Sequence, residues 1–164
     1  MGMEIPSELR SLLGVLGYTW PEADETALVE MGRAWVSFSD RLESVVADAT
    51  STAGEVWAEH EGEAVAAFET WWGREDSPAR TLQDGANAAT LTGTGLIVCG
   101  GIVLALKVAI IAQLAILAVQ IAQAIATAAP TFGASLAEIP IFQQLTGRIV
   151  GNLMDHAMVE LLDG

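Results

Sequence analysis

The sequence predicts an all-α protein, an elongated helical bundle that forms a single domain over residues 1–164. Two observations carry this prediction. Apolar residues recur at alternating three- and four-residue steps along most of the chain, which is the period of helices packed on neighbouring helices. Breaks containing glycine or proline separate the periodic segments, and no segment has the two-residue alternation that is typical of a strand.

The first segment, residues 1–22, is expected to be a short helix followed by a loop. Pro6 and Ser7 are favourable residues for the first turn of a helix. The apolar side of this helix consists of Leu9, Leu12, Leu13 and Leu16. The loop contains two aromatic residues and a proline, and Asp24 after it is a suitable N-cap for the next helix.

A helical hairpin is expected over residues 24–73. Its first arm, residues 24–58, carries an apolar stripe at heptad spacing with most charges off the stripe, so we expect this stripe to be the inner seam. The seam residues are Leu28, Met31, Trp35, Phe38, Leu42 and Val45. His60 and Gly62 form the expected turn, because glycine adopts backbone conformations that other residues avoid.

A long apolar helix is expected over residues 78–129, after a break of glycine, charges and proline. Pro130 ends it, and residues 140–163 form a final helix. One face of the long helix carries large aliphatic residues and the opposite face is small and apolar. The small face consists of Ala105, Val108, Ala112, Ala115, Val119 and Ala122. An ordinary surface helix carries charges on such a face, so we expect it to contact the final helix or a partner.

The charge of the chain is uneven. Residues 1–84 hold 17 acidic and 5 basic residues, whereas residues 85–164 hold 4 and 2, within a net charge of −14. This charge disfavours binding to nucleic acid and to anionic lipid surfaces. The single cysteine, Cys99, excludes an internal disulfide, and the N-terminal residues show no pattern of a cleavable signal peptide.

An alternative reading places the second half of the chain in a membrane. Residues 96–129 are apolar and long enough to cross a bilayer, and small residues at four-residue spacing also occur between closely packed membrane helices. Lys107 and Gln113 lie near the centre of this run, where polar groups are unfavourable in hydrocarbon. The alternative function is therefore a membrane-inserting or pore-forming protein that uses residues 96–160, and membrane contact is possible but not favoured.

No pattern in the chain indicates chemistry. The helix motif of zinc proteases needs a second histidine four residues after the first, but Ala64 stands four residues after His60. Nothing marks a nucleophile or a glycine-rich phosphate loop. We therefore expect no metal, no other cofactor and no enzymatic activity.

Four local patterns follow one another along nearly the whole chain. They are Trp20-Pro21-Glu22-Ala23-Asp24, the step Ala34-Trp35, the turn and helix start Gly62-Glu63-Ala64 with Phe68 downstream, and the segment Gly133-Ala134-Ser135-Leu136-Ala137-Glu138-Ile139-Pro140. In this order they resemble the WXG100-like (ESAT-6-like) domains at the N-terminus of actinobacterial type VII-secreted polymorphic toxins, such as the mycobacterial channel protein with a necrotizing toxin. The chain departs from that family where it reads His60-Glu61-Gly62 instead of Trp-x-Gly.

The resemblance implies a non-enzymatic module that targets its chain to type VII secretion. Such a module binds small WXG100 proteins in a helical complex and engages the secretion machinery, and self-association stays open. The candidate docking aromatics are Trp57, Phe68, Trp71 and Trp72. The implied location is the cytoplasm before export, and then the secreted or cell-surface fraction, without a cleavable signal peptide.

Overall fold

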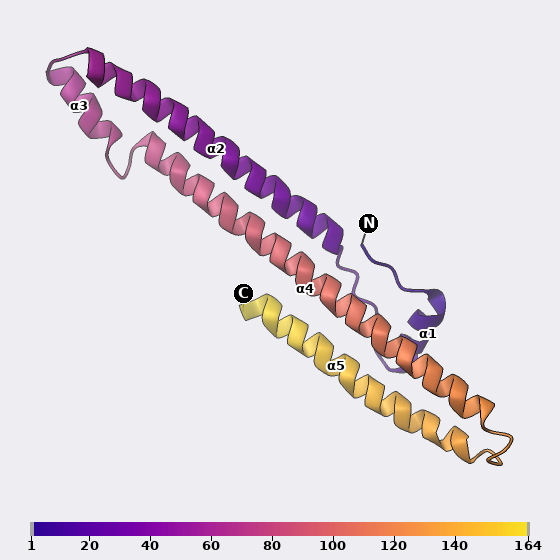
Figure 1. Ribbon diagram of the computed structural model, residues 1–164. Coiled ribbons are helices and arrows are strands. Elements are labelled where there is room, and N and C mark those ends of the chain that lie inside the picture. The colour runs from indigo at the N-terminus through magenta and orange to yellow at the C-terminus, as the bar shows by residue number, and fades with distance from the viewer. Residues whose placement is uncertain (1, 164) are drawn as a thin grey trace. The chain divides into compact units, whose positions relative to one another are not determined.

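The computed structural model describes residues 2–163, and every regular element in that range is helical. The elements are α1 (Ser7–Val15), α2 (Glu25–Glu59), α3 (Glu63–Trp72), α4 (Pro78–Ala126), the short 3-10 helix η1 (Ala134–Glu138) and α5 (Ile139–Asp163) (Figure 1). The expected all-α fold is confirmed. The long apolar helix ends at Ala126, where we expected residue 129, and a 3-10 helix occupies part of the expected loop.

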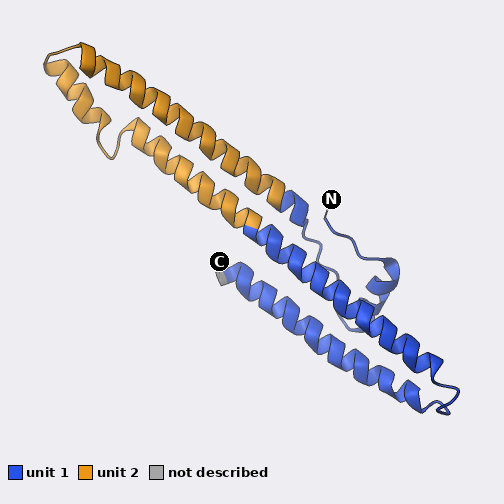
Figure 2. Cartoon of the chain, viewed as in Figure 1, with its two compact units in different colours: residues 1–28, 98–164 blue, residues 29–97 orange. Residues whose placement is uncertain are grey.

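Contacts divide the chain into two compact units (Figure 2). Unit 1 consists of residues 1–28 and 98–164, and unit 2 consists of residues 29–97. Both α2 and α4 contribute residues to each unit, so the units are not consecutive segments of the chain. The assignment of the whole chain to one domain stays a prediction.

In unit 2, α2 and the first part of α4 lie side by side and antiparallel, with α3 in the connection between them (Figure 1). The chain turns after α2 at His60 and Gly62, and Gly62 has φ +132°, a conformation that favours glycine. At the start of α4, Pro78 is the first helical residue. The Oγ of Ser77 accepts a hydrogen bond from the N–H of Arg80 at 3.3 Å and so caps the helix.

The two helices of unit 2 meet along a seam of small residues. The buried residues of this seam are Gly32, Ser39 and Ala53 on α2 and Ala86, Ala89 and Gly93 on α4. A Cβ atom on Gly32 would lie 2.6 Å from the carbonyl oxygen of Gly93, and the reverse distance is also 2.6 Å. Ser39 Oγ donates a hydrogen bond to the carbonyl of Ala86 at 2.7 Å. The absence of side-chain bulk therefore brings the two backbones into direct contact.

This seam corrects the one that we expected on α2. Met31 and Phe38 precede Gly32 and Ser39 by one residue, and Trp35 and Leu42 follow them by three. The expected seam is therefore rotated by about 60–100° around the helix. Its exposed members are Met31, Trp35, Phe38 and Val45, and Leu28 and Leu42 are half-buried. The physical reason is that small residues allow a closer approach of the backbones, so the helices pack along Gly32 and Ser39. The large side chains are left on the surface.

Unit 1 packs α1, the second part of α4 and α5 around a hydrophobic core. The buried core residues are Ile5, Leu13, Ile110, Leu114 and Val150. The loop before α2 adds Tyr18 and Trp20, which are half-buried against this core. The hydroxyl of Tyr18 lies 2.5 Å from the position that a Cβ on Gly151 would take, so the small residue on α5 makes room for the tyrosine.

Among the described residues, α4 is the one helix whose length and composition would allow it to cross a membrane. The most apolar 18-residue window of this helix has a mean hydropathy of 2.6, and 28% of that window is buried inside the structure. Much of the apolar surface of α4 is therefore not covered by the rest of the chain. The function of the chain therefore depends on whether a partner protein or a membrane contacts this surface.

Candidate interaction site

A buried ion pair joins α4 to the start of α2 within unit 1. The Nζ of Lys107 lies 2.7 Å from Oε2 of Glu25, and the two side chains are 3% and 7% exposed. The other carboxylate oxygen, Oε1, accepts a hydrogen bond from the backbone N–H of Met3. A buried charge is unfavourable unless it is paired and hydrogen-bonded, and this pair meets both conditions.

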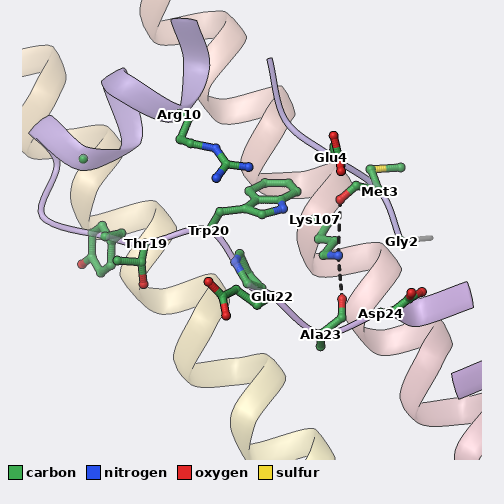
Figure 3. Close-up of a pocket in the computed structure, with 13 residues that line it drawn as sticks. Gly2, Met3, Glu4, Arg10, Thr19, Trp20, Glu22, Ala23, Asp24 and Lys107 are labelled. Atoms are coloured by element: carbon green, nitrogen blue, oxygen red, sulfur yellow. Dashed lines mark hydrogen bonds between the residues drawn. The ribbon is translucent and has the colours of Figure 1, made fainter. Parts of the chain in front are cut away.

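Lys107 also holds two stretches of backbone. Its ammonium donates to the carbonyl of Ala23 at 2.7 Å and to the carbonyl of Met3 at 3.3 Å (Figure 3). The ring of Trp20 lies beside the ammonium, with its centroid 5.7 Å from Nζ. An ammonium has three donors, and all three are used here. Lys107 therefore fastens the N-terminal segment and the loop before α2 to α4.

The environment of Glu25 changes its pKa in opposing ways. Desolvation by burial raises the pKa, and the hydrogen bonds from Lys107 and from the N–H of Met3 lower it. The net effect is a pKa below the ordinary value, so Glu25 stays ionised in the folded protein. The neighbouring Asp24 caps α2 as expected, because its Oδ1 accepts a hydrogen bond from the N–H of Ala27 at 3.0 Å. That bond lowers the pKa of Asp24.

A hollow of about 500 Å³ lies beside this ion pair. Arg10, Tyr18, Trp20 and Lys107 are among the residues that line it, and Figure 3 shows the guanidinium of Arg10 next to the Trp20 ring. Because the donors of Lys107 are already occupied, this ammonium has none left for a ligand. In the described part of the chain, no group of three or more histidine, cysteine, aspartate or glutamate side chains could hold a metal ion.

The large residues of α2 form an aromatic surface on unit 2. The rings of Trp35 and Phe38 lie 6.0 Å apart between centroids, with an interplanar angle of 81°. Their side chains are 40% and 47% exposed, and Met31 and Val45 extend the same stripe along the helix. We name these four residues the α2 stripe. Exposed aromatic residues at helical spacing are typical of a surface that packs on another helix.

A second aromatic group lies at the connection between α2 and α4. The ring centroid of Phe68 on α3 lies 5.6 Å from that of Trp57, 6.1 Å from that of Trp71 and 5.8 Å from that of Trp72. These four residues are the docking aromatics that the sequence indicated, and the structure gathers them into one cluster. The nearby turn residues His60 and Gly62 are exposed. The assignment of the cluster to docking stays a prediction.

The small face of α4 is open in unit 1. All six of its residues are exposed, namely Ala105, Val108, Ala112, Ala115, Val119 and Ala122. The opposite side of the helix carries the buried residues Ile110, Leu114 and Leu117. We name the six exposed residues the α4 back face. Within the described residues α5 does not bury this face, so a contact with a partner is the expectation that remains.

The model of a family described as WXG100 like domain matches residues 5–149. The chain belongs to the WXG100-like domain family. Members of this family are helical proteins related to type VII secretion, where they take part in protein–protein interactions. No curated protein and no solved structure shows a significant match to the chain.

Two features of this WXG100-like domain were missed from the sequence. The partner of Lys107 was not identified, although a lone lysine in an apolar run requires a buried acidic partner. The small-residue seam of α2 was also missed, although Glu25, Gly32, Ser39 and Ala53 recur at multiples of seven residues. That second heptad series was the signal that could have located the inner face of the helix.

Proposed function

We propose that this chain is a non-enzymatic assembly and targeting module for type VII secretion, which binds a small WXG100 protein as its helical partner. The complex forms in the cytoplasm and is then exported by the secretion machinery to the outside of the cell or to its surface. The role requires association rather than catalysis. The observation that carries the proposal is the exposed α4 back face in a WXG100-like domain.

The chemistry of the α4 back face supports a helical partner. Its residues follow the heptad steps 105, 108, 112, 115, 119 and 122, and the side chains are alanine and valine. Small side chains at this spacing allow a second helix to pack closely, as Gly32 and Gly93 do inside unit 2. A partner helix with small or aliphatic residues at the same spacing fits this face.

The α2 stripe supports the same role from unit 2. Tryptophan and other aromatic residues contribute more to protein interfaces than most side chains do, because they bury a large area at little entropic cost. Trp35 and Phe38 are exposed and lie at helical spacing on one side of α2. We infer that this stripe packs on the helices of the partner, and that the α3 cluster around Phe68 contributes to docking on the secretion machinery.

The burial of Lys107 favours this proposal over a membrane-spanning form of residues 96–160. In a spanning helix this lysine would have to leave Glu25 and enter hydrocarbon or a pore. In the structure its three donors are satisfied inside unit 1. We therefore assign the α4 back face to partner binding.

The proposal is tested by co-expressing the chain with small WXG100 proteins and by measuring whether a stoichiometric complex co-purifies. Replacing Ala112 and Ala115 by arginine places two charges in the α4 back face, so co-purification should be lost while the isolated chain stays helical by circular dichroism. Unfolding of the isolated double variant would instead show that the face belongs to the core.

The control places one arginine elsewhere on α4. Ala88 is exposed and lies in unit 2, outside the back face. Ala88→Arg should leave the complex intact. Equal loss of the complex in the control and in the double variant would contradict the assignment of the back face, and absence of any complex with the unmodified chain would contradict the proposed function itself.

A further inference from the structure

The end of the α4–α5 hairpin in unit 1 is an uncharged apolar tip. We define the tip as residues 125–136, which leave α4, turn and enter η1. Its large exposed side chains are Ile125 at 58%, Phe132 at 100% and Leu136 at 43%. No charged residue occurs between Lys107 and Glu138. Leaving a phenylalanine side chain fully exposed to water is less favourable than covering it with other apolar groups. An exposed apolar patch of this kind marks a contact site.

The backbone holds Phe132 outward at a conformational cost. Its φ is +51°, in the left-handed region that bulky residues rarely adopt. The adjacent N–H of Gly133 donates to the carbonyl of Ala128 at 2.8 Å, which closes the turn after α4. A glycine at position 132 would adopt this turn without strain. Strain of this kind is concentrated at functional positions, so an aromatic residue here indicates that the exposed ring is used.

The polar groups of the tip are largely satisfied by the tip and by the last residues of α4 before it. The hydroxyls of Thr127, Thr131 and Ser135 donate to the carbonyls of Gln123, Thr127 and Ala124 at 2.9, 2.7 and 2.8 Å. The backbone N–H groups of residues 131–134 all donate hydrogen bonds to carbonyls within the turn. Protein interfaces rely on hydrogen bonds at their rim, whereas hydrocarbon demands that polar groups be paired internally.

We propose that this tip docks on a neutral lipid bilayer, with Phe132 inserted among the acyl chains and Ile125 and Leu136 at the level of the headgroups. The contact is shallow, because the core of unit 1 and the Lys107–Glu25 pair stay intact. Glu138 lies two residues after the tip and marks the edge that remains in water. The net charge of −14 directs the contact to neutral rather than anionic membranes.

The test is flotation of the full chain, without partner, on vesicles of phosphatidylcholine. The chain is expected to float with these vesicles and to bind less to vesicles that contain phosphatidylserine. Phe132→Asp should lower the apparent partition coefficient by about tenfold or more, because a charged carboxylate replaces the ring that enters the acyl chains. The matched control is Leu91→Asp, which changes a 75% exposed leucine of α4 in unit 2 and should not alter binding.

A second variant separates lipid binding from folding. Phe132→Gly relieves the positive φ, so the free energy of unfolding should stay equal or rise while vesicle binding falls by about tenfold. The proposal is overturned if the unmodified chain does not float, or if Phe132→Gly floats equally well. Light scattering without vesicles tests another occupant, since a fall in molecular mass for Phe132→Asp would show that the tip joins two copies. None of these measurements depends on the WXG100 partner.

Discussion

Lys107 and Glu25 are separated by 82 positions in the sequence, and their charged atoms lie 2.7 Å apart in the core of unit 1. The same ammonium binds the carbonyls of Met3 and Ala23, which belong to the N-terminal segment and to the loop before α2. One side chain of α4 thus orders three other pieces of chain. The stability of unit 1 should depend on this residue more than on any surface charge.

Lys107→Met keeps the length of the side chain and removes its charge. The carboxylate of Glu25 would then be buried without its partner, so the free energy of unfolding at pH 7 should fall by about 3–5 kcal/mol. Urea unfolding followed by circular dichroism measures this change. The control is Arg74→Gln, which breaks the exposed pair of Arg74 with Asp76 and should change the free energy by less than about 1 kcal/mol. Equal effects in the two variants would contradict the role of Lys107.

The lowered pKa of Glu25 predicts acid sensitivity. The carboxyl has an ordinary pKa of 4.5 and a lower pKa in the folded protein, so the unfolded chain takes up the proton first as the pH falls. The contribution of ionised Glu25 to the free energy of unfolding is complete above about pH 4.5. It is lost as the pH falls through the pKa that Glu25 has in the folded protein. Unfolding measured from pH 7 to pH 3 should show the difference between the unmodified chain and Glu25→Gln shrinking below pH 4.5. A constant difference across this range would refute the linkage.

The close contact in unit 2 predicts opposite effects for two glycines of α4. A Cβ on Gly93 would lie 2.6 Å from the carbonyl oxygen of Gly32, so Gly93→Ala should lower the free energy of unfolding by about 1–3 kcal/mol. Two residues later, a Cβ on Gly95 would meet nothing within 4 Å. Gly95→Ala should raise the free energy by up to about 1 kcal/mol, since alanine is the better helix former. Thermal unfolding of the two variants decides the point, and changes of the same sign would argue against the close approach.

The α2 stripe is expected to hold the partner. Trp35→Ala and Phe38→Ala should each weaken the complex with the small WXG100 protein by about tenfold or more, because they remove aromatic rings from the interface. Since both side chains are largely exposed in the isolated chain, its unfolding should change little. Titration calorimetry with the purified partner provides the affinity. Leu82→Ala, an exposed residue of α4, is the matched control and should leave the affinity unchanged.

The helices of this chain could be predicted from the spacing of apolar residues and from the breaks at Gly62 and Pro78. The inner face of α2 could not be predicted in this way. Two heptad series run along this helix, one of large apolar side chains and one of small side chains. The series of small residues forms the inner face because Gly93, 61 residues after Gly32, lets the two backbones come into contact. The partner of Lys107 was equally hidden, since any of 21 acidic residues could have supplied the carboxylate.

The long sequence separation of Glu25 and Lys107 also bears on how the chain folds as it is synthesised. The N-terminal segment and the carboxylate of Glu25 leave the ribosome well before the lysine does, so they have no native partner for the time needed to translate 82 further residues. Contacts between distant residues form late, because closing a long loop costs conformational entropy. Unit 2, residues 29–97, is complete earlier and can form its α2–α4 seam first. During that interval Ile5 and Leu13, which belong to the core of unit 1, have no α4 residues to pack on.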